Sequence, residues 1–288
     1  MQSFSLNIRG HIREFSTPQV MGILNVTPDS FYAGSRTIGG EADRVDAMAR
    51  QLVDEGADII DIGGCSTRPG SETAAAAEEM RRVASGIEAV RRVSADIIIS
   101  VDTFRASVAR QAVALGADIV NDISAGTMDP GMIPAVAAMG VPYIMMHTRG
   151  NPDNMLTLTD YPLGVCAGVV SELQPQIVKA TLEGIADIIV DPGFGFAKTP
   201  EQNYELMAGL PEVGRLLGDR PMLVGVSRKS MIYRPLGITP AEALPGTTVL
   251  NALALERGAA ILRVHDVAAC RQAVDVMRLF ARNSSAAN

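Results

Sequence analysis

The chain has few cysteines and no long apolar run, and each lack excludes a class of protein. Its three cysteines, Cys65, Cys166 and Cys270, are odd in number and far apart, which is unlike a structural zinc site or a redox motif and favours reduced thiols. No apolar stretch approaches the roughly 20 residues of a membrane span. Residues 1–13 mix polar and charged side chains, unlike a signal peptide. We therefore expect a soluble, cytoplasmic protein.

Positive charge is also scarce. The net charge of −7 argues against a general nucleic-acid surface, because nonspecific binding depends on many Lys and Arg contacts to phosphates. No Gly-rich dinucleotide motif follows the first predicted strand. With 47% hydrophobic and 20% charged residues over 288 positions, the chain can bury one large core. An anionic ligand would have to meet a local cluster of basic residues.

One short sequence pattern occurs four times. In each copy, the end of a predicted helix is followed by a hydrophobic strand whose last residue is polar. The copies span residues 56–61, 116–121, 185–191 and 258–263. A strand buried on both faces can carry an unbroken aliphatic run, so a polar residue at its end must lie where the strand leaves the core. These polar ends should converge at one end of the fold.

Eight apolar runs of strand length are separated by stretches of helical periodicity. The runs are 20–24, 59–62, 97–101, 119–120, 143–146, 188–190, 222–226 and 260–264. Eight alternating units favour an α/β fold of the (β/α)8 TIM-barrel type over an open doubly wound sheet. Residues 4–15 alternate around a central Gly10 and predict an N-terminal β-hairpin that plugs the barrel floor. No linker divides the chain, so we expect one domain over residues 1–288.

Polar side chains follow the predicted strands. They are Asn25, Asp61, Asp102, Asn121, His147, Asp191, Ser227 to Lys229, and Arg263 with His265. Each one alone could be a cap or a satisfied hydrogen bond. Together they suit a ligand with several donors and acceptors, because an unpaired buried polar group costs about 1–3 kcal/mol. Three long connections, 27–40, 63–73 and 148–160, are expected at the same catalytic face as lids and substrate contacts.

Basic residues follow the last two strands, the barrel positions where phosphate is frequently held. Arg263 and His265 are two residues apart on a strand, so their side chains point the same way, and an Arg fork beside an imidazole suits phosphate oxygens. A ligand that carries phosphate is therefore predicted. A salt bridge from Arg263 to a local carboxylate stays open as an alternative.

Asp191 directly follows the sixth run and is followed by a Gly-rich turn with Phe194 and Phe196. A carboxylate beside an aromatic ring can pair with the amidine-like edge of a heterocycle while the ring stacks on its face. We expect one of the two phenylalanines to be ordinary core. After the first strand, Asn25 could hold Mg²⁺ weakly, mostly through water and substrate phosphate, because Mg²⁺ keeps its waters and takes few protein ligands.

Seven ordered motifs carry a resemblance to a known family. They are residues 22–31, 63–70, 101–103, 121–124, 191–196, 227–229 and 263–266. Over nearly its whole length the chain resembles the dihydropteroate synthase family of pterin-binding barrel enzymes. The resemblance implies a transferase of folate synthesis that condenses a dihydropterin carrying a CH2-diphosphate with 4-aminobenzoate, giving dihydropteroate and diphosphate. It also implies a homodimer.

The resemblance also implies roles for residues that match the family motifs. The pterin would lie on Asp102, Asn121, Asp191 and Lys229, with Phe196 beside it. The diphosphate would lie on Arg263, His265 and Mg²⁺ at Asn25, with Lys229, Arg263 and His265 as the catalytic residues. The second loop would add Thr67 and Arg68, and the aminobenzoate site would be formed by Phe31, Pro69, Ser227 and Lys229. Cys65 departs from the family, which commonly has an acidic residue there.

Three other functions remain as alternatives. A methyltetrahydrofolate methyltransferase would share the ring site but would have little use for Arg263 and His265. A noncatalytic pterin-binding homologue would not need the phosphate ligands. A Schiff-base aldolase using Lys229 would leave the predicted pterin-edge residues unexplained.

Overall fold

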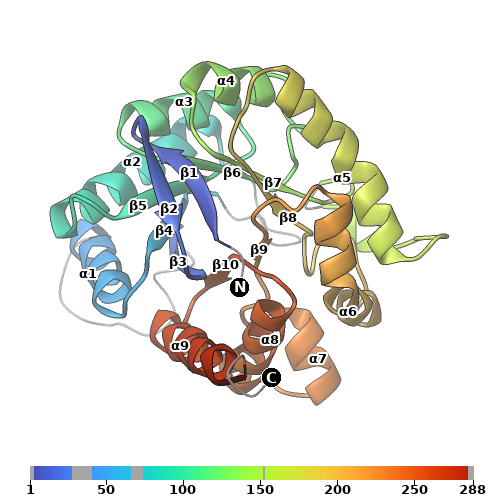
Figure 1. Cartoon of the computed structure of the whole chain (residues 1–288). Coiled ribbons are helices and arrows are strands. Elements are labelled where there is room, and N and C mark those ends of the chain that lie inside the picture. The colour runs from blue at the N-terminus through green and yellow to red at the C-terminus, as the bar shows by residue number, and fades with distance from the viewer. Residues whose placement is uncertain (1–2, 28–40, 66–73, 152, 285–288) are drawn as a thin grey trace.

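The computed structural model describes residues 3–27, 41–65, 74–151 and 153–284, and its centre is a ring of parallel strands surrounded by helices (Figure 1). The strands of the ring are β3 (Gln19–Asn25), β4 (Ile59–Gly63), β5 (Ile98–Asp102), β6 (Ile119–Asp122), β7 (Tyr143–Met146), β8 (Ile188–Asp191), β9 (Leu223–Val224) and β10 (Ile261–Val264). The outer helices are α1 (Glu41–Asp54), α2 (Ala76–Val93), α3 (Ala106–Ala114), α4 (Met132–Met139), α5 (Val165–Leu182), α6 (Pro200–Leu216), α7 (Ser230–Leu236), α8 (Leu244–Glu256) and α9 (Val267–Ser284). Strand and helix alternate as predicted.

The ring closes between β8 and β9, the two strands at the ends of the hydrogen-bonded order. The hydrogen-bonded order is β8-β7-β6-β5-β4-β3-β10-β9, and a parallel bridge between Val190 and Met222 joins β8 to β9. The (β/α)8 barrel predicted from the alternating runs is thereby confirmed. β9 is shorter than the predicted run 222–226, because the chain already turns at Val226, whose carbonyl accepts a hydrogen bond from the Lys229 amide at 3.2 Å.

Inside the ring, an apolar layer fills the end where the strands begin. Its members are one inward-facing residue from each strand: Met21, Ile59, Ile98, Ile119, Ile144, Ile189, Leu223 and Ile261. Leu6, Ile8 and Phe15 of the N-terminal hairpin pack into the same cluster. Such a layer makes the barrel a packed core rather than a pore, so the opposite end of the strands is the one left for polar residues.

The predicted hairpin is present and closes this apolar end. β1 (Phe4–Ile8) pairs antiparallel with β2 (His11–Phe15), and Gly10 at the turn has φ +79°, a conformation that glycine adopts without strain. The Arg9 Nε donates to Asp118 Oδ1 at 2.7 Å. The Asn7 amide donates to Asp187 Oδ2 at 2.7 Å. Hydrogen bonds to the starts of two barrel strands therefore fix the hairpin on the floor.

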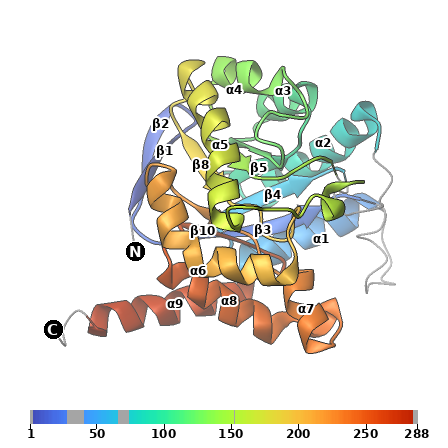
Figure 2. The ribbon, with the colours of Figure 1, turned by 90° about the vertical axis from the view of Figure 1, so that its right-hand side faces the viewer.

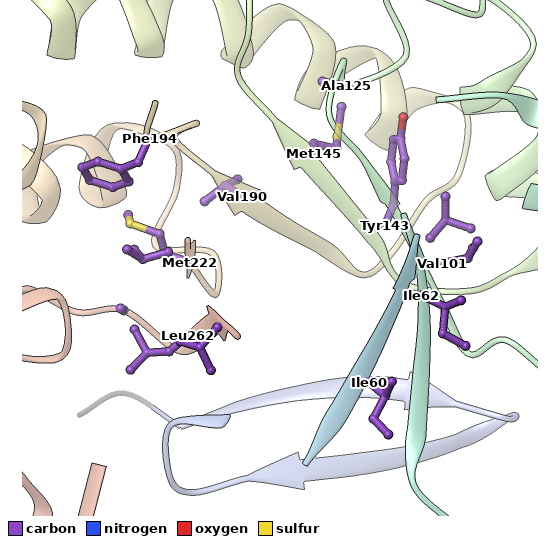
Figure 3. Packing of buried hydrophobic residues seen from close by; sticks show 14 of the residues in the cluster. Ile60, Ile62, Val101, Ala125, Tyr143, Met145, Val190, Phe194, Met222 and Leu262 are labelled. Atoms are coloured by element: carbon purple, nitrogen blue, oxygen red, sulfur yellow. The ribbon is translucent and has the colours of Figure 1, made fainter. Parts of the chain in front are cut away.

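A second and larger apolar cluster lies between the strands and the surrounding helices. The alternate strand residues, such as Ile60, Ile62 and Leu262, point outward into it (Figure 3). Because each strand is buried on both faces, its sequence is an unbroken aliphatic run. Figure 2 shows α8 and α9 side by side along one flank of the barrel. In the ranges that the structure describes, no helix is long and apolar enough to cross a membrane.

Candidate functional site

The polar residues at the strand ends lie together at the carboxyl end of the barrel, as the repeated sequence pattern predicts. In the strand register Asn25 pairs with Gly63, Gly63 with Asp102, and Asp102 with Asn121. The three polar residues lie two or four positions beyond the inner apolar layer, so the two-residue period of a strand turns them into the barrel. This places the predicted metal position beside two predicted pterin residues.

Arg263 contacts two carboxylates directly and is linked to Asn121 through one of them. Its Nε donates to Asp61 Oδ2 at 2.6 Å and its Nη2 to Asp102 Oδ2 at 2.7 Å. Asn121 Nδ2 donates to the same Asp61 oxygen at 3.0 Å. The side chain reaches past β3 to β4 and β5. The alternative of a salt bridge for Arg263 is therefore confirmed, while its contact with diphosphate stays a prediction.

The charges in this network compensate one another. Burial lowers the pKa of Arg263, but the negative charges of Asp61 and Asp102 outweigh it and the pKa is raised, so the guanidinium stays cationic. Burial raises the pKa of Asp102, and the charge of Arg263 opposes that shift. In the described part of the chain, Asp61 Oδ1 and Ser100 Oγ are buried without a hydrogen-bond partner. Their residues pair between β4 and β5, so the floor of the site keeps hydrogen-bonding capacity for a ligand or water.

Asp191 and Lys229 form the second part of the site. Asp191 is 6% exposed, and its Oδ1 accepts a hydrogen bond from the Gly193 amide at 2.7 Å. Burial raises the pKa of Asp191, and the charge of Lys229 is the largest effect that opposes it. Burial lowers the pKa of Lys229 to about 8. Its Nζ donates to the Phe194 carbonyl and lies 4.8 Å from the centre of the Phe196 ring.

The turn after β8 needs its two glycines. Gly193 has φ +74°, and a Cβ there would lie 1.9 Å from the His147 carbonyl oxygen. Gly195 has φ +79°, and a Cβ there would lie 3.0 Å from the Lys229 side chain. Phe194 is fully buried in the core and Phe196 is half-buried beside Lys229. As predicted, one of the two phenylalanines, Phe194, belongs to the core. The contact of Phe196 with a pterin stays a prediction.

The ends of β9 and β10 meet through Ser227 and His265. The Ser227 Oγ lies 3.1 Å from His265 Nδ1 and accepts a hydrogen bond from the His265 amide at 3.2 Å. The neighbouring Arg228 is paired with Asp266, its Nε donating to Oδ2 at 2.8 Å. Arg228 therefore holds the two strand ends together, and its guanidinium is already bound to a carboxylate.

Sequence reasoning did not name two residues of this region as individual site residues. Asp61 is a predicted strand end, and its two-residue offset from Ile59 could have indicated that it faces the interior. Lys198 lies in an irregular loop where periodicity gives no signal, yet it is 5% exposed. The side chain of His147, another predicted strand end, contacts Lys198 and Glu172, while its backbone amide donates to the Asp191 carbonyl at 2.9 Å.

Four predicted site residues, Phe31, Thr67, Arg68 and Pro69, lie outside the described residues. For Mg²⁺, Asn25 offers one carboxamide oxygen, and its strand partner Gly63 has no side chain: a Cβ there would lie 3.2 Å from Asn25 Oδ1. Within the described ranges no group of three or more His, Cys, Asp or Glu side chains could hold a metal ion. This donor set fits a hydrated ion shared with a substrate and does not fit a permanent cage.

Comparison with known proteins adds independent findings. Residues 21–265 match the family of pterin binding enzymes. The dihydropteroate synthase of Synechocystis sp. is 47% identical over 260 residues, which cover 88% of this chain and 86% of that protein. The Escherichia coli K12 dihydropteroate synthase is 40% identical over 282 residues, 96% of each chain. A solved structure of the Xanthomonas albilineans dihydropteroate synthase with 4-aminobenzoic acid has a TM-score of 0.88 at 39% identity, covering 97% of this chain and 99% of that chain.

Proposed function

This chain belongs to the family of pterin-binding enzymes and is a transferase of the dihydropteroate synthase type, and we propose that it condenses (7,8-dihydropterin-6-yl)methyl diphosphate with 4-aminobenzoate. The products are 7,8-dihydropteroate and diphosphate. The observation that carries the proposal is the convergence of Asp102, Asn121, Asp191, Lys229 and Arg263 at one end of one barrel. The relatives are synthases, and this leaves the methyltransferase, aldolase and noncatalytic alternatives without support.

The pterin ring would be recognised by the buried polar residues. Asp191 would accept hydrogen bonds from the N–H groups of the ring's pyrimidine edge. One of its oxygens already accepts from the Gly193 amide, but a carboxylate has further lone pairs for the ring. Asn121 and Asp102 would contact the same ring from β6 and β5. Phe196 and Lys229 lie against each other at the side of the site. A ring that leaves these groups unpaired would bind poorly, since each unmet buried partner costs about 1–3 kcal/mol.

The diphosphate would lie against Arg263 and His265. Asn25 would hold a hydrated Mg²⁺ through its carboxamide oxygen, and the bound ion would supply charge neutralisation for the leaving group. Arg263 is cationic, so it stabilises negative charge without a proton transfer. His265 is exposed at the end of β10 and hydrogen-bonds with Ser227, which orients its ring for a phosphate oxygen.

The reaction then requires little acid–base chemistry. The C–O bond to diphosphate breaks first, and the electron-rich pterin delocalises the positive charge left on the CH2 group. The amine nitrogen of 4-aminobenzoate forms the new C–N bond and releases a proton to solvent. Because the nucleophile is a neutral amine attacking a cation, the residues contribute position and charge stabilisation rather than a general base.

Diphosphate release tests substrate, ion and order together. With the pterin diphosphate, 4-aminobenzoate and Mg²⁺, we expect equal amounts of diphosphate and dihydropteroate. Chelation of Mg²⁺ should lower the rate by about 100-fold or more, since it removes charge stabilisation of the leaving group. Slow release with Mg²⁺ but without the amine would support departure before attack. Tight pterin binding with no diphosphate release under any condition would contradict the proposal.

We also propose that two copies of the chain associate through α8 and α9. Helix α9 carries three exposed apolar side chains, Val276 (62% exposed), Leu279 (59%) and Phe280 (62%). Their spacing puts them on one face of the helix. Val249 on the neighbouring α8 is 59% exposed, and the two helices lie side by side (Figure 1 and Figure 2). An exposed apolar face of this kind is typical of a subunit interface.

A charge in this face should separate the copies. In the Val276→Glu/Phe280→Glu variant we expect the dimer dissociation constant to rise by about 100-fold or more, because two carboxylates would be buried without partners. Sedimentation velocity over a concentration series measures this. Leu182→Glu is the matched control, because Leu182 is 83% exposed on α5, away from α9. A wild-type chain that sediments as a monomer at all concentrations would overturn the dimer.

A further inference from the structure

Lys198 is a buried cation that the mechanism above does not use. It lies just before α6 and is 5% exposed. The chain contains only three lysines, Lys179, Lys198 and Lys229, although it contains 25 basic residues of Lys and Arg type. Two of the three lysines, Lys198 and Lys229, donate to carbonyls of the turn that follows β8. Of these two, Lys198 is the buried one.

The Lys198 ammonium has an acceptor for each of its three protons. Its Nζ donates to the carbonyls of Gly193 and Phe196 at 2.9 and 3.0 Å, and it lies 3.0 Å from His147 Nδ1. A neutral amine could donate only two hydrogen bonds, so this arrangement matches the charged form. Two of the three acceptors belong to the turn itself.

These bonds fix the turn that Lys229 also contacts. The Phe196 amide also donates to the Gly193 carbonyl at 3.2 Å, so the two residues that Lys198 binds are joined to each other. Lys229 donates to the Phe194 carbonyl of the same turn and lies over the Phe196 ring. The position of the ring and of that carbonyl therefore depends on Lys198.

His147 connects Lys198 to helix α5. Because Lys198 donates to His147 Nδ1, the other ring nitrogen carries the proton and donates to Glu172 Oε2 at 3.1 Å. Arg149 in turn donates to Glu172. Burial lowers the pKa of His147 to about 4, so the imidazole is neutral near pH 7. It holds Lys198 in place and adds no charge of its own.

The main compensating charge for Lys198 is that of Asp191. Burial lowers the pKa of Lys198 to about 7, and the positive charges of Lys229 and Arg149 add to this shift. Asp191 is the largest influence that opposes it, followed by Glu172. The charges that oppose the raised pKa of Asp191 are those of Lys229, Arg263 and Lys198. Asp191 thus has a cation on the site side in Lys229 and another behind the turn in Lys198.

We propose that Lys198 is a positioning residue for the pterin-binding end of the site: its ammonium group fixes the turn over residues 192–197 and supplies, from behind that turn, positive charge that keeps Asp191 ionised for the ring. The proposal rests on the proposed function, because it takes the ligand of Asp191 to be a pterin. Lys198 does not touch the ligand, and it acts through Asp191, Phe196 and the backbone between them.

The test measures binding of a pterin that lacks a leaving group, by calorimetry, between about pH 5 and pH 6, where His147 is neutral and Lys198 is charged. In Lys198→Met, which keeps most of the apolar stem and removes the ammonium group, we expect the dissociation constant to rise about 30-fold or more at pH 6. Pterin affinity should fall at low pH as Asp191 gains a proton. In Lys198→Met we expect this fall to occur about one pH unit higher than in the wild type, because Asp191 gains a proton more readily without the Lys198 charge. The KM for 4-aminobenzoate should change by less than about threefold.

Lys179→Met is the matched control, because Lys179 is exposed on α5, and its pterin affinity and pH profile should equal those of the wild type. His147→Leu is a second variant that keeps the ammonium and removes one acceptor, and it should weaken pterin binding by about fivefold. If Lys198→Met does not fold, wild-type affinity in His147→Leu overturns the inference by itself.

The outcomes separate the two claims. If Lys198→Met loses pterin affinity equally at every pH, Lys198 acts through packing and not through its charge, and the inference is overturned. Unchanged pterin binding in this variant would also overturn it. Absence of pterin binding by the wild type would overturn the proposed function, and the inference with it. Pterin binding by the wild type, together with a fall in affinity at higher pH in Lys198→Met, supports both the proposed function and the role of Lys198.

Discussion

Replacing Asp191 with alanine is expected to lower kcat/KM for the pterin substrate by about 10³-fold, because the loss of a buried charged partner costs about 4 kcal/mol and each 1.4 kcal/mol is a factor of ten. Asp191 is 6% exposed at the end of β8. Its removal leaves the N–H groups of the bound ring unpaired and takes a compensating charge from Lys229. Steady-state assays over a range of pterin concentrations measure the change.

A control for this variant lies in the same stretch of chain. Asp187 stands just before β8 at the other end of the barrel, where it accepts a hydrogen bond from the Asn7 amide. Asp187→Ala should reduce stability but keep kcat/KM within about threefold, because distant independent sites do not couple. A kcat/KM in Asp191→Ala that equals the control would remove Asp191 from the ring site.

Lys229→Ala should give a loss of similar size, and the Asp191→Ala/Lys229→Ala double variant should lose little more than either single variant. The two groups act as one unit, since each is the largest charge that stabilises the ionised form of the other. Fully additive losses would indicate that they serve separate steps.

The barrel could be predicted from the sequence because each strand shows the same physical signal. Two buried faces require an aliphatic run, and the polar residue that ends it marks the open end of the barrel. β7 was predicted at the observed bounds, Tyr143–Met146. The run 222–226 overestimated β9, because apolar residues continue beyond the last ladder hydrogen bond and periodicity does not report where the chain turns.

The convergence of the site was also predictable, while its internal pairings were not. The two-residue period indicates that Asp102 and Asn121 face the interior, but it cannot tell which carboxylates Arg263 will reach, because that depends on the distance across β3 in the closed ring. His147 follows its strand like the other polar ends and yet turns away from them. Lys198 lies in a loop without any period, so only its burial and contacts in the fold reveal it.

The Arg263 pairings lead to the second large prediction, which concerns stability. Arg263→Met leaves Asp61 and Asp102 in the barrel interior without the cation that both now contact. Removing one partner of a buried ion pair costs about 3–5 kcal/mol. We expect the free energy of unfolding at pH 8 to fall by about that amount, measured by urea denaturation with an unchanged m value.

The control is Arg228→Met, the same chemical change at the neighbouring strand end. Arg228 also pairs with one carboxylate, Asp266, but their side chains are 33% and 21% exposed, whereas Asp61 is fully buried. Partial solvation weakens an ion pair, so this variant should lose only about 1 kcal/mol. The difference between the two variants isolates the burial of the charges from the loss of a guanidinium as such.

The pH dependence distinguishes charge from packing in Arg263→Met. Burial already raises the pKa of Asp102, and loss of Arg263 removes the charge that opposes this shift. The folded state of the variant then binds a proton that the unfolded state releases, so stability is gained as the pH falls and lost as it rises through the folded-state pKa. We expect roughly half of the lost stability to return near pH 5. A deficit that is equal at pH 5 and pH 8 would mean that the Arg263 side chain stabilises the barrel through its packing, and that the two carboxylates do not need its charge.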